Sequence, residues 1–203
     1  RGTVTHKLLR YWHVEGPMNL ADVPYWVDQV IGVGDGFAPY RCDVDETTGY
    51  CLSLAGWLHE TGFTSVVTEI PGFRDGDTPY ACTLDAIGGF PNDPAVYVLD
   101  VKTSAASNRF HALQLSAQAT CDWYGVPGTA EKLMRADVFA APPTLASLLV
   151  QPDKSTFRVC SGADEAWDNT LALYYGLFGA GMPFQTDKPR VTKAPRLREE
   201  ALV

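Results

Sequence analysis

The chain has 203 residues, of which 46% are hydrophobic and 20% are charged, values that are typical of one globular domain. It contains no run of roughly eighteen apolar residues, and this excludes a transmembrane helix. The formal net charge of −8 excludes a broad cationic surface. It does not exclude nucleic acid as a ligand, because carboxylates that hold Mg2+ also make a chain acidic.

The beginning of the chain and its cysteines indicate the compartment. Arg1 is not followed by a charged and then apolar leader, so we expect no secretory signal. Because no initiator Met is present, we expect that some sequence precedes Arg1. The five cysteines are odd in number and lack C-x-x-C spacing. This pattern favours reduced thiols in a cytoplasmic protein over disulfides or a zinc ribbon.

The first third of the sequence is predicted to be helical. Apolar residues recur at helical spacing in residues 3–13, 22–31 and about 47–61. Glycines and Pro39 interrupt the chain after the second helix, and Gly62 is expected to end the third.

The remainder alternates strands with helices and then ends in a tail. The predicted elements are strands at 65–70, 80–87 and 95–103, a helix at 107–124, strands at 145–151 and 156–160, and a helix at 162–179. This order predicts an α/β fold, with a central mixed sheet flanked by helices on both faces. Residues 1–182 would form one domain, and residues 183–203 a basic, proline-containing tail that we expect to contact DNA or a partner.

The strand at 95–103 carries an acid and a base near its end. Because side chains alternate along a strand, Asp100 and Lys102 point to the same face. Burying both charges is costly unless they are paired or bind a metal ion. A simple buried salt bridge, or a strand that ends in solvent, remains an equally good explanation of this spacing alone.

Two neighbouring strands each carry one further carboxylate, Glu69 and Asp85. Clustered carboxylates repel one another unless a cation lies between them, and Mg2+ or Mn2+ is the natural occupant of an oxygen-rich site. If the first two strands form a hairpin, these two acids lie at opposite strand ends unless a bend or a register shift brings them together.

The succession of Glu69, Asp85 and Asp100-Val101-Lys102 resembles the PD-(D/E)XK nuclease superfamily. This resemblance implies a restriction-endonuclease-like core. It also implies that Asp85 and Asp100 bind the metal with the Val101 carbonyl, that Lys102 orients or deprotonates the attacking water, and that Glu69 is a second-shell or second-metal acid.

Two helical motifs narrow the resemblance to the RecB-like branch, which includes phage and CRISPR-associated exonucleases. Gly2-Thr-Val-Thr-His6 matches its G-x-x-x-H motif, and this implies that His6 is a metal ligand. Gln114 matches the Gln of its Q-x-x-x-Y motif and would position Lys102, the water or the DNA backbone, but Gln118 replaces the Tyr. Gln118 fits a helix-surface amide equally well.

Two other histidines share a predicted helix with one of the motif residues. His13 lies about 10.5 Å of helical rise from His6, too far to share its metal ion. His111 precedes Gln114 by one turn, so it would lie beside the site only if its turn of the helix faces it. The resemblance implies one or two Mg2+ or Mn2+ ions, and no iron–sulfur cluster, because no cysteine triplet follows the core.

The sequence therefore predicts a metal-dependent DNA nuclease, with exonuclease activity on linear ends or single strands in recombination, repair or phage replication. A restriction-type endonuclease is the alternative within the enzyme class. A catalytically silent DNA- or protein-binding module is the alternative outside it. Expected partners are DNA and a recombination, annealing or helicase protein, with no membrane.

Overall fold

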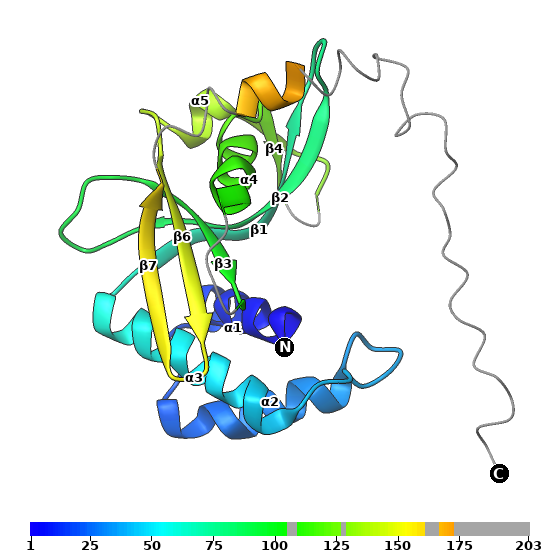
Figure 1. The fold of residues 1–203 in the computed structure, drawn as a ribbon, viewed down its shortest axis with the longest axis vertical. Helices are drawn as coiled ribbons and strands as arrows, with labels where there is room; N and C mark the ends of the chain where they lie inside the picture. The colour runs from blue at the N-terminus through cyan, green and yellow to red at the C-terminus, as the bar shows by residue number, and fades with distance from the viewer. Residues whose placement is uncertain (105–108, 127–128, 161–166, 173–203) are drawn as a thin grey trace, which may run out of the picture.

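A computed structural model describes residues 1–104, 109–126, 129–160 and 167–172 of the chain (Figure 1). Its helical elements are α1 (Gly2–Glu15), the 3-10 turn η1 (Leu20–Asp22), α2 (Val23–Val33), α3 (Val44–Thr61), α4 (Arg109–Ala119) and the short α5 (Arg135–Val138). Residues 167–172 are also helical, whereas the rest of the predicted helix at 162–179 and the tail at 183–203 lie outside the described residues.

The strands form one seven-stranded mixed sheet. They are β1 (Thr64–Arg74), β2 (Tyr80–Gly89), β3 (Tyr97–Lys102), β4 (Trp123–Gly125), β5 (Lys132–Met134), β6 (Thr144–Gln151) and β7 (Lys154–Cys160). Their order across the sheet is β5-β4-β1-β2-β3-β6-β7. Only β3 and β6 pair in parallel, with α4 in the connection between them. The predicted α/β class and mixed sheet are confirmed.

Helices cover both faces of the sheet, and each face has its own core (Figure 1). Leu99 and Val101 of β3 belong to the core beneath α1, α2 and α3. Val98 belongs to the second core, which contains Leu115 of α4. Because side chains alternate along β3, Asp100 and Lys102 lie on the α4 face of the strand.

Helix α3 shows how local signals set the element boundaries. The Asp43 side chain accepts a hydrogen bond from the Glu46 amide at 2.7 Å, which caps the first turn. Gly62 ends the helix with φ 65°, as predicted. Because Asp43 is the cap, α3 begins at Val44 and not near residue 47.

The structure corrects three predicted elements. The helix expected over 107–124 ends at Ala119, because Trp123 and Tyr124 leave it to pair with β1. Strand β1 continues through Pro71 to Arg74, where a turn was expected, because its end is paired with β2. Strand β3 begins at Tyr97 and not at residue 95.

Two further observations concern the cysteines and the lengths of the helices. All five cysteines are free thiols. Among the described residues, no helix has the length and apolar content needed to cross a membrane.

Candidate functional site

Three acidic residues lie in a row across β1, β2 and β3. The β1–β2 ladder pairs the residues on either side of Glu69 with those on either side of Asp85, so these two acids lie opposite one another. The β2–β3 ladder pairs Ala86 with Leu99, and its next position places Asp85 opposite Asp100. Of the two arrangements considered for a hairpin, the structure has the one in which Glu69 and Asp85 lie together, and not at opposite strand ends. Both are mid-strand, because the hairpin turn lies beyond Arg74.

Glu69 has an unusual backbone conformation. Its φ of 52° is the only positive value of a non-glycine residue in the described part of the chain. Such a conformation costs about 1–3 kcal/mol and persists where the surroundings impose it, often at functional sites. The Glu69 carboxylate forms an ion pair with Arg10 of α1 at 3.2 Å. Both side chains are partly exposed, so the pair contributes little stability.

Asp100 is the most deeply buried acid of the row, with an exposed fraction of 0%. Its Oδ1 accepts a hydrogen bond from the Lys102 ammonium at 2.7 Å, whereas Oδ2 is buried without a hydrogen-bond partner. Burial and the nearby Asp85 carboxylate raise the pKa of Asp100 to about 6, although Lys102 and His6 oppose this shift. A buried carboxylate oxygen without a partner is costly, and a cation beside it would offset that cost.

His6 and Asp85 lie around the Val101 peptide. The Val101 amide donates to Asp85 Oδ2 at 2.7 Å, and His6 Nε2 lies 2.9 Å from the Val101 carbonyl oxygen. Because a carbonyl oxygen only accepts hydrogen bonds, Nε2 is the donor in this contact. The other ring nitrogen, Nδ1, lies 3.7 Å from Asp85 Oδ1. The His6 ring therefore lies between the Val101 carbonyl oxygen and the Asp85 carboxylate.

His6, Val101 and Lys102 line a cavity of about 420 Å³ beside the amino-terminal end of α1, and Asp85 and Asp100 lie behind these residues without lining it. Its lining residues are Gly2, Thr3, His6, Lys7, Glu69, Val101, Lys102 and Thr103. The Gly2 Cα lies close against Thr103, since a Cβ added there would be 3.1 Å from Thr103 Oγ1. The first turn of a helix favours anions through its free amides, so this wall of the cavity is suited to a phosphate.

A divalent ion requires several oxygen or nitrogen donors that lie close together. Within the described residues, no three His, Cys, Asp or Glu side chains lie close enough together to hold a metal ion. The predicted ligands nevertheless lie beside one another, because Asp85 is opposite Asp100, and His6 and Asp85 both contact the Val101 peptide. Together they offer carboxylate, imidazole and carbonyl donors. Such a set suits Mn2+ or Mg2+, and the unpartnered Asp100 Oδ2 supplies a vacant donor atom. The residues therefore fit the ion in chemical type.

The residues of α4 that lie near the site differ from those that the sequence predicted. Gln114 is exposed and forms no hydrogen bond with the acidic row among the described residues. Gln118, one turn later, is fully buried and donates a hydrogen bond to the Thr83 carbonyl at 2.8 Å. The alternative prediction that Gln118 is a surface amide is therefore wrong. His111 lies near Lys102, and burial together with that positive charge lowers its pKa.

The remaining histidines lie outside the row and bond to backbone. His13 Nδ1 lies 2.8 Å from the Ser65 carbonyl oxygen, and His59 Nε2 lies 2.9 Å from that of Met18. Sequence reasoning missed Arg10 and gave no role to Lys7. A signal was present for Arg10, because it follows His6 by four residues and so occupies the same helix face.

Comparison of the chain with protein-family models found no matching family, and no curated protein matches it. The assignment of a function therefore depends on the residues and geometry described above.

Proposed function

We propose that this chain is a Mg2+- or Mn2+-dependent DNA nuclease of the PD-(D/E)XK type. The observation that carries the proposal is the fully buried Asp100, which has one oxygen bonded to Lys102 and the other without a partner. Asp85 and Glu69 continue this acidic row on the two adjacent strands. Lys102 and Arg10 each pair with one of the three acids, and a metal ion would compensate the negative charge that remains.

The topology supports a restriction-endonuclease-like core. Strands β1, β2 and β3 are antiparallel, and the chain then passes through α4, β4, β5 and α5 before it reaches β6, which is parallel to β3. The acidic residues lie on the three successive strands, as the resemblance implies.

The chain's own residues have distinct parts in the proposed hydrolysis. Asp85, Asp100, His6 and the Val101 carbonyl would hold the metal ion, which supplies positive charge that promotes water deprotonation and stabilises the phosphate transition state. Lys102 would orient the attacking water and donate a hydrogen bond to the scissile phosphate.

The His6 contacts favour the RecB-like exonuclease branch over the restriction-type endonuclease. His6 lies beside the Val101 carbonyl and Asp85, where that branch has its imidazole ligand. We therefore propose action on DNA ends or single strands, in recombination, repair or phage replication, with a helicase or annealing protein as a possible partner class.

The test compares linear DNA with covalently closed circular DNA in Mn2+ or Mg2+. We expect linear DNA to be degraded, circular DNA to survive, and EDTA to stop the reaction. Cutting of the closed circle would instead assign a restriction-type endonuclease.

A catalytically silent DNA- or protein-binding module is the second candidate, because Asp100 and Glu69 each already contact a cationic side chain. Binding of DNA without cleavage of either substrate, at any Mn2+ concentration, would favour this candidate.

A further inference from the structure

We propose that a groove between α1 and α2 binds an unpaired nucleobase of the DNA strand that lies at Lys102. This inference rests on the proposed function and specifies its substrate as a strand with at least one unstacked base. The groove has a volume of about 570 Å³, within the range of roughly 300–1,000 Å³ that small-molecule sites occupy.

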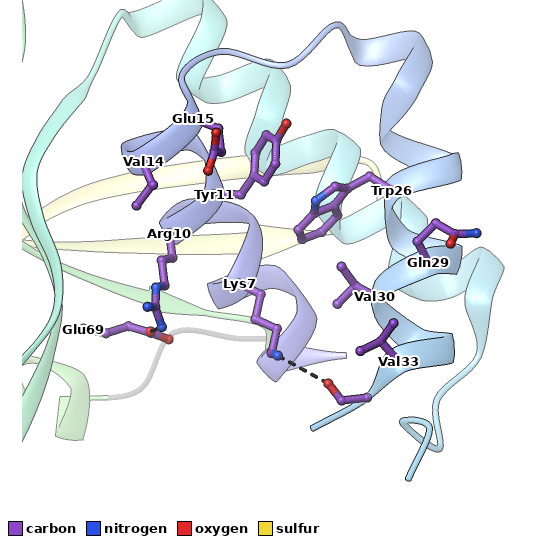
Figure 2. Close-up of a pocket in the computed structure, with 11 residues that line it drawn as sticks. Lys7, Arg10, Tyr11, Val14, Glu15, Trp26, Gln29, Val30, Val33 and Glu69 are labelled. Carbon is purple, nitrogen blue, oxygen red and sulfur yellow. Dashed lines mark hydrogen bonds and ion pairs between the residues drawn. The ribbon is translucent and has the colours of Figure 1, made fainter. Parts of the chain in front are cut away.

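The groove is continuous with the candidate active site. Lys7 and Glu69 line both the groove and the cavity that contains His6 and Lys102. Figure 2 shows Lys7 and Tyr11 of α1 facing Trp26 and Val30 of α2 across the groove. A strand with its scissile phosphate in the cavity would therefore have a neighbouring nucleotide at the groove.

The walls of the groove suit a base and not a second phosphate. Tyr11 and Trp26 meet edge to face, with ring centroids 5.7 Å apart, and both are partly buried. Val14 and Val33 extend the apolar surface and are 64% and 68% exposed. An unpaired base can stack its π-face on an aromatic and apolar surface that is open to solvent. This stacking does not depend on which of the bases is present.

Lys7 is suited to bind the phosphate that would lie between the cavity and the groove. Its ammonium lies 3.4 Å from the Gly34 carbonyl oxygen and 5.3 Å from the centre of the Tyr40 ring. Among the described residues it forms no ion pair with a carboxylate. Arg10, by contrast, is paired with Glu69. Lys7 is therefore the cation at this junction that remains available to a phosphate.

A base that is paired within a duplex does not fit the groove. A paired base is stacked on both sides and bonded to its partner, so it enters a side groove only after it leaves the helix. The groove therefore predicts a preference for single strands or frayed ends.

The test measures binding of short fluorescent oligonucleotides by the full chain in Ca2+, with their integrity checked on a gel. Trp26→Leu removes the stacking ring but keeps apolar bulk, and Trp26→Phe keeps a ring. Tyr25→Ala is the matched control, because Tyr25 is 71% exposed on the same helix and does not line the groove.

We expect Trp26→Leu to weaken binding of a single-stranded oligonucleotide roughly tenfold, and Trp26→Phe and Tyr25→Ala to change it less than about twofold. The penalty should vanish with an oligonucleotide that lacks its bases. Thermal unfolding verifies that each variant is folded. An equal loss of affinity for both oligonucleotides would overturn the base-binding role.

The outcomes separate this inference from the proposed function. If the chain cleaves DNA and Trp26→Leu binds single strands like the unmodified chain, the groove does not bind a base and the inference is overturned. If the chain never cleaves DNA yet shows the base-dependent penalty, only the nuclease assignment fails. If the unmodified chain binds no oligonucleotide, both are overturned.

Discussion

Lys102 and Asp100 form an ion pair at 2.7 Å in which the carboxylate is fully buried and the lysine side chain remains 22% exposed. The two residues lie on the same face of β3, and this arrangement leaves the ammonium at the edge of the cavity. The buried partner holds Lys102 in place, while its exposed part can reach a phosphate or a water molecule.

Removal of either partner should therefore abolish cleavage. We expect Asp100→Ala and Lys102→Ala each to lower the rate of DNA cleavage by roughly 10²–10⁴-fold or more. Asp100→Ala should also weaken Mn2+ binding, measured by calorimetry, whereas Lys102→Ala should largely preserve it. Asp153→Ala is the control, because Asp153 is an exposed acid in the turn between β6 and β7. Near-normal cleavage by either site variant would disprove the assignment.

The raised pKa of Asp100 predicts a pH dependence of stability in EDTA. Its pKa is about 6 in the folded chain, against an ordinary value of 3.8, so the folded state keeps a proton that the unfolded state loses. The stabilisation is present below about pH 4 and is lost as the pH rises to about 6. The total is about 3 kcal/mol.

Urea unfolding of the unmodified chain and of Asp100→Asn at several pH values measures this effect. The free energy of unfolding of the unmodified chain, relative to the variant, should fall between pH 4 and pH 7. A difference that stays constant over this interval would contradict the raised pKa.

His6 should contribute to metal affinity and selectivity. An imidazole nitrogen suits Mn2+ better than Ca2+, so His6→Ala should raise the Mn2+ concentration needed for half-maximal cleavage about tenfold or more. His13→Ala is the matched control on the same helix, since His13 bonds to the Ser65 carbonyl and lies outside the acidic row. Equal Mn2+ requirements of the two variants would remove His6 from the ligand set.

Two glycines should respond oppositely to replacement by alanine. Gly56 lies inside α3, and a Cβ there would meet nothing within 4 Å, so Gly56→Ala should raise the free energy of unfolding by about 0.5–1 kcal/mol. At Gly88 of β2, a Cβ would lie 2.3 Å from the Thr64 carbonyl oxygen and 2.8 Å from Phe63 Cζ. Gly88→Ala should lower the free energy of unfolding by about 1–3 kcal/mol or more.

Thermal and chemical unfolding of both variants measure these changes. Because neither glycine lines the cavity or the groove, cleavage per folded molecule should be unchanged. A stable Gly88→Ala variant would show that β1 shifts readily at this point.

The sequence by itself determined the elements whose signals are local. The apolar periodicity of residues 3–13 and the capping signal at Gly62 depend only on neighbouring residues, so α1 and the end of α3 were predicted correctly. The alternation of side chains also placed Asp100 and Lys102 on one face of a buried strand. Short β4 was missed, because its three residues gain their stability from pairing with β1 and carry too little pattern of their own.

Only the tertiary structure decided which of these residues meet. Glu69 lies opposite Asp85 because of the register of a long hairpin, and register depends on pairing between strands that no single segment encodes. Gln114 and Gln118 lie one turn apart on the same face of α4, yet Gln114 is exposed and Gln118 is buried against the Thr83 carbonyl, because each turn of the helix packs against a different part of the fold. The groove beside Lys7 exists because the packing of α1 against α2 brings their residues together with Glu69 of β1. Such packing depends on contacts between residues far apart in the chain, and these follow from the fold as a whole.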